Sequence, residues 1–210
     1  MSGGNHTVQR WKWLLLLLGF WFPVLLSGCD EGSPEVDPAE RSRIVAVAAP
    51  AATALRQGLV TRLTAAMEEG GPVGAIGFCS TEAIPLTQAI QSGLHEGLTL
   101  KRTSFRYRNP ANAPDEAEEA ALLYFERSLQ DMPEPPSFFT QRVSEEEVRY
   151  YEPLLVGEFC LQCHGAPDLL DPQVRAVLAE KYPGDLATGY SPGDFRGLIR
   201  VSIPTAAIVQ

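Results

Sequence analysis

The sequence is poor in basic residues, in histidine and in methionine. Its 210 residues include 17 Lys and Arg against 26 Asp and Glu, with only 3 His and 3 Met. The net charge of −9 argues against nucleic acid and anionic lipid as partners, because both attract basic surfaces. Internal repeats and low-complexity tracts are also lacking, and the hydrophobic content of 45% is typical of globular chains. We therefore expect one globular domain that binds no nucleic acid.

Long hydrophobic runs are lacking apart from one near the N-terminus. Arg10 and Lys12 precede an almost unbroken apolar run of 14 residues from Trp13 to Leu26. An ordinary membrane span needs about 18 residues or more. A basic start followed by a short apolar run predicts a secretory signal peptide over residues 1–28, with an uncleaved anchor helix as the alternative. Cleavage would leave 15 basic and 26 acidic residues, a net charge of −11.

The end of this run carries a second signal. Leu26-Ser27-Gly28-Cys29 resembles a bacterial lipobox, which implies cleavage before Cys29 and lipidation of its thiol and new amino group. We therefore predict an exported protein on the periplasmic face of a bacterial membrane, anchored through lipid on Cys29. Asp30 resembles the inner-membrane retention signal of some Gram-negative lipoproteins. Residues 29–37 are predicted to form an acidic tether, and residues 38–210 the domain.

The domain is predicted to begin with a long helix. Asp37, Pro38 and Glu40 fit the N-cap, N1 and N3 positions, where carboxylates meet free amides and proline loses no hydrogen bond. Apolar residues then recur at helical spacing as far as Glu69. Gly70-Gly71 provide the stop.

The long helix should kink or break at Ala49, because the next residue, Pro50, lacks a backbone donor. Strands and shorter helices are expected to follow. In chain order the predicted elements are strand 72–79, helix 81–94, strand 98–108, a helix from Asp115 with Glu118 at N3 that Pro133 closes, strands 138–143 and 148–156, a short helix at 160–164, helix 171–181 and strand 195–203. Four or five antiparallel strands with helices between them predict an α+β fold with a PAS-like sheet.

Cysteine is scarce, but two of the four cysteines stand in a specific pattern. Cys160-Leu161-Gln162-Cys163-His164 is a C-x-x-C-H motif, the attachment signature of c-type haem. Thiols at i and i+3 on one helical face can reach the two vinyl groups of haem, and the next residue presents an imidazole to the iron. Zinc is one alternative, but it would need a fourth ligand and would have to bind the adjacent residues Cys163 and His164 together. A thioredoxin-like dithiol is another, but the motif lacks the surrounding βαβ pattern. We therefore predict one covalent haem c with His164 bound to the iron.

The second ligand of the iron can be sought by elimination. The remaining candidates in the mature chain are Cys79, His95, Met67 and Met132, with Lys101 and Lys181 as weaker ones. Cys79 is the one thiol not assigned to lipid or thioether, and its predicted place at a helix start favours a thiolate. A continuous helix would separate it from His95 by about 24 Å, so both cannot bind one iron. The alternatives are a buried apolar role for Cys79 and a helix-end polar role for His95.

Four segments are characteristic when taken together. They are Ala75-Ile76-Gly77-Phe78-Cys79, the run from Arg108 to Pro114, Cys160 to Gly165, and Tyr182 to Tyr190 leading to Gly193-Asp194-Phe195-Arg196-Gly197. With them the chain resembles the bacterial PAS-like c-type haem domains, a family formerly classed as a domain of unknown function. The resemblance implies a PAS-like fold and iron held by histidine and cysteine, here His164 and Cys79.

A basic group stands out in this acidic chain: Lys101, Arg102, Arg106 and Arg108. Haem propionates need cationic or amide partners, and arginine offers a two-pronged one. We therefore predict that Arg106 and Arg108 bind the cofactor. A charge-protected edge strand is the alternative interpretation.

The predicted ligation limits the function. Two protein ligands leave no open iron position for a substrate, so we expect no enzymatic activity. One hypothesis is a redox or small-ligand sensor, in which reduction or a gas such as nitric oxide displaces Cys79. The other is a one-electron transfer protein that docks a redox or signalling partner at the membrane surface.

Overall fold

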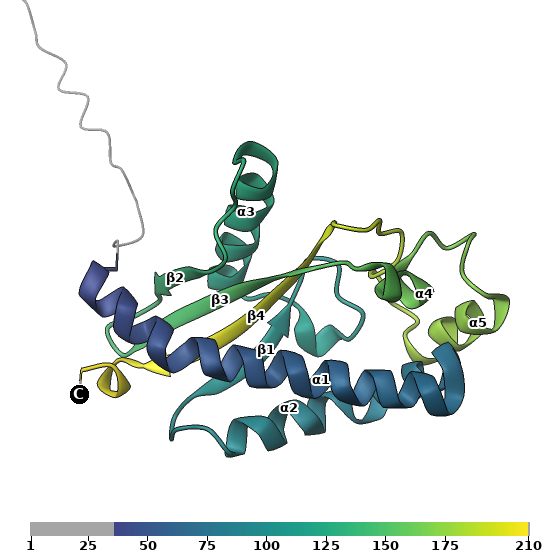
Figure 1. Ribbon diagram of the computed structural model, residues 1–210, viewed down its shortest axis with the longest axis horizontal. Coiled ribbons are helices and arrows are strands. Elements are labelled where there is room, and N and C mark those ends of the chain that lie inside the picture. Colours follow the sequence, from purple (N-terminus) through teal and green to yellow (C-terminus); the bar gives the residue numbers. More distant parts are fainter. Residues whose placement is uncertain (1–35, 210) are drawn as a thin grey trace, which may run out of the picture. The chain divides into compact units, whose positions relative to one another are not determined.

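The computed structural model describes residues 36–209. The predicted signal peptide, the predicted lipidation site Cys29 and most of the predicted tether lie outside these residues. The described chain contains five α-helices and four strands (Figure 1). In order they are α1 (Pro38–Thr81), α2 (Ala83–Ser92), β1 (Thr99–Thr103), α3 (Glu116–Asp131), β2 (Phe139–Arg142), β3 (Glu147–Leu155), α4 (Leu161–His164), α5 (Pro172–Lys181) and β4 (Phe195–Pro204).

The four strands form one antiparallel sheet in the order β1-β4-β3-β2. Helix α1 packs on one face of the sheet, where Ile44 and Leu55 meet Ile199 and Val201 in the main core cluster. Helix α3 covers part of the other face through Phe125, and the aromatic side chains of β2 and β3 complete that cluster. The fold is therefore α+β with a PAS-like antiparallel sheet, as predicted.

The long first helix begins as predicted and continues through Pro50. The Asp37 side chain accepts a hydrogen bond from the Glu40 amide, and Pro38 occupies the first turn. Gly71 is the one residue inside the helix with non-helical dihedral angles, so the break expected next to Pro50 is wrong. Pro50 is exposed, so its missing amide costs little there.

The chain reverses at Gly71. Its φ of 61° and ψ of −163° suit glycine alone. The segment after Gly71 runs back along the part of α1 that precedes Gly71. An ion pair of 3.0 Å between Arg62 and Glu82 joins the two. The stop predicted at Gly70-Gly71 is thus a helical hairpin. The strand predicted for residues 72–79 is wrong, because these apolar residues form a helix that packs Ile76 against α5.

Other boundaries differ less from the predictions. Strand β1 ends at Thr103 instead of Arg108, and the chain then turns through residues 104–109. At the start of α3, the Asp115 and Glu118 side chains each accept a hydrogen bond from the other's amide, which confirms the predicted capping box.

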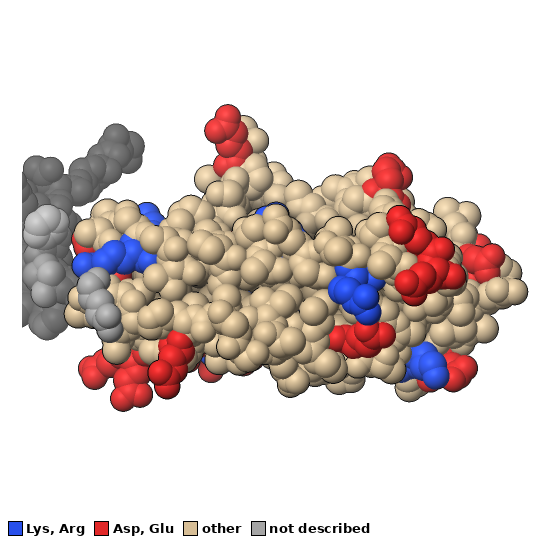
Figure 2. All heavy atoms as spheres, turned by 60° about the horizontal axis from the view of Figure 1, so that its bottom comes forward, with Lys and Arg blue, Asp and Glu red and all other residues tan. Residues whose placement is uncertain are grey.

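The face formed by α1 and α2 shows few charged side chains, and acidic groups gather near its ends (Figure 2). Helix α1 has the length and hydropathy of a membrane span by composition alone. Five of its eight buried residues belong to the main core of the sheet, which is also a sufficient reason for their apolar character.

Candidate functional site

The C-x-x-C-H segment lines an apolar cavity between α1 and the short helix α4. Cys160 ends a 3₁₀ turn, Glu158–Cys160, and Cys163 and His164 lie in α4. Together with Cys79 these side chains line a cavity of about 110 Å³. The remaining wall is largely apolar: Leu63, Met67, Ala75, Ile76 and Phe159. Three thiols and one imidazole therefore line a single space, and the haem-binding roles of Cys79, Cys160, Cys163 and His164 stay predictions.

The His164 ring is held so that one nitrogen remains available. Its Nδ1 lies 2.6 Å from the carbonyl oxygen of Ala187, which makes Nδ1 the hydrogen-bond donor and leaves Nε2 without a proton. Burial lowers the pKa of His164 to about 3, and the charges of Arg108 and Arg196 act in the same direction. The imidazole is therefore neutral near pH 7 and suited to bind a metal through Nε2.

A backbone segment, residues 185–190, fixes this orientation. The amides of Gly189 and Tyr190 donate to the carbonyls of Gly165 (2.7 Å) and His164 (2.9 Å). The Ala187 amide donates to the Asp185 carboxylate at 2.8 Å, so the carbonyl that meets His164 belongs to a braced turn. We call residues 185–190 the histidine strap.

Arg108 ties the histidine strap to α4. Its Nη2 donates to the carbonyls of Cys163 (2.6 Å) and Ala187 (3.2 Å). Its Nε donates to Asp185 at 3.0 Å. Arg108 also lines the cavity, but its guanidinium is engaged by protein groups. The sequence singled out Arg108 without predicting this bracing role, which depends on partners 55 or more residues away.

Arg106 contacts the other end of the strap. Its guanidinium donates to the carbonyls of Leu186 and Thr188 and lies over the Tyr190 ring at 3.9 Å. The guanidiniums of Arg106 and Arg108 are thus both bound to groups of the chain. Their predicted role as propionate partners stays a prediction.

Cys79 reaches the cavity by another route than the one predicted. It lies in the last turn of α1, four residues before α2 begins, so the predicted position at a strand end and helix start, where a dipole would favour the thiolate, is wrong. Burial raises the pKa of the Cys79 thiol, while the charges of Arg102 and Arg108 oppose this rise. Cationic neighbours, not the helix dipole, favour the thiolate here.

The structure separates the other candidate ligands. Met67 lines the same cavity as Cys79. His95 is exposed beyond the end of α2, and Met132 is exposed at the end of α3. Lys101 binds Glu118, and Lys181 pairs with Glu180. Cys79 and Met67 are therefore the two candidates that the fold brings to the same cavity as His164. Within residues 36–209, no three His, Cys, Asp or Glu side chains form a group that could hold a metal ion.

A second, cationic pocket of about 160 Å³ also contacts His164. Arg102 of β1 and Arg196 of β4 line it together with Tyr107 and Asn112. Burial lowers the pKa of both guanidiniums. The sequence placed Arg102 in a basic group but did not select it. Arg196 was missed as a site residue, and the one signal for it was its place in the last segment that resembles the haem family.

Comparisons with known proteins show a family and a similar fold. A family model described as Tll0287-like matches residues 33–204. The crystal structure of the cyanobacterial heme-protein Tll0287 is similar, with a TM-score of 0.54 and 26% sequence identity over 80% of this chain and 96% of that one. Among curated proteins no match is found.

Proposed function

The chain belongs to the Tll0287-like family, and on that premise we propose that it carries one haem c bound covalently through Cys160 and Cys163. The observation that carries this proposal is the meeting of both thiols with His164 and Cys79 in one apolar cavity. The similar cyanobacterial protein is described as a heme-protein. When bound, haem supplies an iron that changes between two oxidation states.

The residues present fit such a group. His164 offers Nε2 because the Ala187 carbonyl holds the proton on Nδ1. Cys79 offers a thiolate, which favours ferric iron and a low reduction potential. The wall around the thiol groups is largely apolar, which suits the hydrocarbon part of haem. Two ligands from the chain leave no free iron position, so the proposal includes no enzymatic activity.

We favour a redox or small-ligand sensor as the role of this centre. The support is the environment of Cys79, where burial opposes the thiolate and two arginines favour it. A ligand held in this balance is suited to be released on reduction or replaced by a small gas. Release of Cys79 from the iron would alter the segment of α1 after Gly71, whose Ile76 packs against α5.

One-electron transfer is the second candidate. Phe159 lines the cavity and is 46% exposed, so the cofactor edge would lie close to the surface. A partner could exchange electrons there without entering the fold. Lipid on Cys29, outside the described residues, would keep either activity at the periplasmic face of a membrane.

Covalent haem attachment is tested first. The protein is expressed with a c-haem maturation system, and the pyridine haemochrome assay should give one haem per chain. Cys160→Ala combined with Cys163→Ala should abolish the covalent link. Purified wild type with stoichiometric zinc and no haem would overturn the proposal.

The second axial ligand is tested by a matched pair of variants, because Cys79 and Met67 line the same cavity. Cys79→Ser should change the low-spin ferric electron paramagnetic resonance spectrum and raise the reduction potential, since a hydroxyl or water replaces an anionic donor. Met67→Leu should change neither. A silent Cys79→Ser with a shifted Met67→Leu would reassign the ligand.

Carbon monoxide separates the two roles. Binding to the ferrous wild type would show an exchangeable ligand and favour the sensor. A ferrous protein that does not bind carbon monoxide would favour electron transfer.

The predicted lipid anchor is tested independently. A clickable fatty acid should label cells that express the wild type and not cells that express the Cys29→Ala variant.

A further inference from the structure

Two arginines meet in the cationic pocket without a counter-charge. Arg102 and Arg196 come from β1 and β4, which are neighbours in the sheet. The strands approach closely here, since a Cβ added to Gly197 would lie 2.3 Å from the Thr103 carbonyl oxygen. The side chains therefore face one small space from two rigid elements, with His164 in its wall.

Neither guanidinium forms an ion pair within residues 36–209. Arg196 donates through Nη1 to the carbonyl of Arg106 at 3.1 Å. Asp185 favours the charge of Arg196 electrostatically, but its carboxylate is bound to Arg108 and forms no ion pair with Arg196. Arg102 is influenced by Cys79 and Tyr182, both neutral when protonated. Both side chains are half-buried, and a charge that is partly withdrawn from water without a partner is costly, so an anion is expected in this pocket.

The position of the pocket indicates which anion it takes. His164 lines both the apolar cavity and the cationic pocket, so the two spaces are neighbours. Haem has the same division: its vinyl groups lie at one edge and its two propionates at the opposite edge. A porphyrin fixed through Cys160 and Cys163 in the apolar cavity would direct its carboxylates away from these thiols.

We propose that Arg102 and Arg196 bind the two propionate carboxylates of the haem. This proposal rests on the proposed function, because it needs a haem attached at Cys160 and Cys163. It assigns the carboxylate site to arginines without an acidic partner, and it leaves Arg106 and Arg108 to hold the histidine strap. Guanidinium and carboxylate can form two parallel hydrogen bonds, which makes arginine the suitable residue.

The two guanidiniums also affect the iron. Positive charge close to haem favours the ferrous form, because reduction adds an electron to the centre. Replacing Arg102 or Arg196 by a neutral residue should therefore lower the reduction potential, and the double replacement should lower it further. The propionate bending bands in the resonance Raman spectrum should shift, since these bands respond to the hydrogen bonds of the carboxylates.

The experiment uses the holoprotein and compares Arg102→Gln, Arg196→Gln and their combination with wild type. Arg127→Gln, an exposed position on α3, is the control for loss of one surface charge. Arg106→Gln tests the competing assignment. Haem per chain is measured first. We expect shifted propionate bands and a lower potential for Arg102 and Arg196, and no band shift for Arg106 or Arg127.

The outcomes distinguish the two proposals. Absence of covalent haem in the wild type would overturn the proposed function. Normal haem content with unchanged bands and potential in the double variant, or bands that move only for Arg106→Gln, would overturn the propionate assignment alone. If the Gln variants mature poorly, Arg102→Lys and Arg196→Lys supply the test. They keep the charge but lose the two-pronged hydrogen bond, so the bands should shift while the potential stays close to wild type.

Discussion

Two charged clusters share strands β1 and β4 but differ in how their charges are balanced. Lys101 and Arg102 are adjacent on β1, so their side chains point to opposite faces of the sheet. On the face of α3, Lys101 forms an ion pair of 2.6 Å with the fully buried Glu118. On the other face, Arg102 has no acidic partner within residues 36–209, in the pocket that it shares with Arg196.

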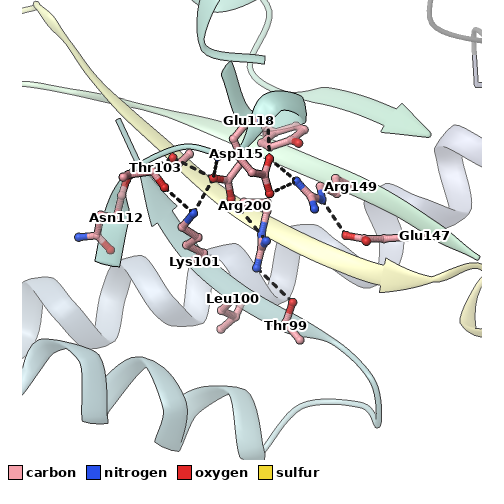
Figure 3. Close-up of polar contacts among 12 residues, drawn as sticks. Thr99, Leu100, Lys101, Thr103, Asn112, Asp115, Glu118, Glu147, Arg149 and Arg200 are labelled. Carbon is pink, nitrogen blue, oxygen red and sulfur yellow. Dashed lines mark hydrogen bonds and ion pairs between the residues drawn. The ribbon is translucent and has the colours of Figure 1, made fainter. Parts of the chain in front are cut away.

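The first cluster, which we call the paired cluster, is completed by two more arginines. Figure 3 shows Arg200 and Arg149 beside the carboxylates of Glu118, Asp115 and Glu147. Arg149 lies 2.8 Å from Asp115 and 2.7 Å from Glu147, while Arg200 lies 3.4 Å from Glu118. Charges that are neutralised within the chain serve the fold. Charges that are not neutralised point to a ligand.

Breaking the paired cluster should have the largest effect. Glu118→Gln removes the carboxylate that holds Lys101 and Arg200, so it would leave two cations without a counter-charge, as in the other cluster. Because removal of one partner of a buried ion pair typically costs about 3–5 kcal/mol, we expect a loss of that size in the free energy of unfolding. Urea denaturation measures it.

The neighbouring Glu119→Gln is the control, since Glu119 is exposed on the same helix and should change stability by less than about 0.5 kcal/mol. Equal small losses for both variants would show that the paired cluster is not a stabilising element. The contrast between the two clusters would then fail.

Local signals in the sequence predicted part of these regions. The capping box of Asp115 and Glu118 and the short helix of the C-x-x-C-H motif depend on residues within five positions of each other, and both are found as predicted. The second role of Glu118, as the partner of Lys101, depends on a contact 17 residues away. Nothing in the local pattern indicates that contact.

The same reason explains the errors near the site. Residues 72–79 have the length and apolar content of a buried strand. They are helical in the structure, where Ile76 packs against α5, and this contact lies far away in the sequence. Arg196 becomes a site residue because β4 lies beside β1, which is a property of the sheet and not of the sequence around it. Local structure carried by a short motif could be predicted, and partners brought together by topology could not.

The reversal at Gly71 should be the next most sensitive point, because it brings Cys79 back to the cofactor region. Gly71→Ala places a side chain in a backbone region that is almost restricted to glycine, at a cost of about 1–3 kcal/mol. An added Cβ would meet no atom within 4 Å, so backbone strain alone is tested. Thermal or urea denaturation of the holoprotein measures the loss.

Gly70→Ala is the matched control. Its added Cβ would also meet no atom within 4 Å, but its backbone is helical, so alanine should stabilise by up to about 1 kcal/mol. Opposite signs at two adjacent glycines would confirm the hairpin. Losses of equal size would contradict the reversal at Gly71.

Acid should weaken the paired cluster by a smaller amount. Although burial opposes it, hydrogen bonds from the Glu118 amide and Arg149 hold the pKa of Asp115 below its ordinary value, and Arg149 does the same for Glu147. A carboxyl with a lowered folded pKa contributes stability above its unfolded pKa and loses it as the pH falls through the folded value. Stability should therefore decline below about pH 4.5.

Asp115→Asn tests this in urea denaturation at a series of pH values. Asparagine keeps the N-cap hydrogen bond of α3 but does not titrate, so the acid-dependent loss should become smaller than in wild type. An identical pH profile for both proteins would assign the loss to other carboxyls. The effect stays modest because the Asp115 side chain is 46% exposed and solvent screens its charge.

The smallest effect is expected for the ion pair that crosses the helical hairpin. Arg62 and Glu82 are 3.0 Å apart, as close as many buried pairs, but both side chains are 55% exposed. Because water and salt screen such a pair, a double-mutant cycle with Arg62→Gln and Glu82→Gln should give a coupling below about 1 kcal/mol. It should fade in about 1 M salt, where the screening length is about 3 Å. The same cycle with Lys101→Met and Glu118→Gln should give a larger coupling that salt hardly changes, because Glu118 is fully buried. If the two cycles gave equal couplings with equal salt dependence, burial would not be what distinguishes these ion pairs, and the absence of a counter-charge beside Arg102 and Arg196 would lose its value as a sign of a ligand.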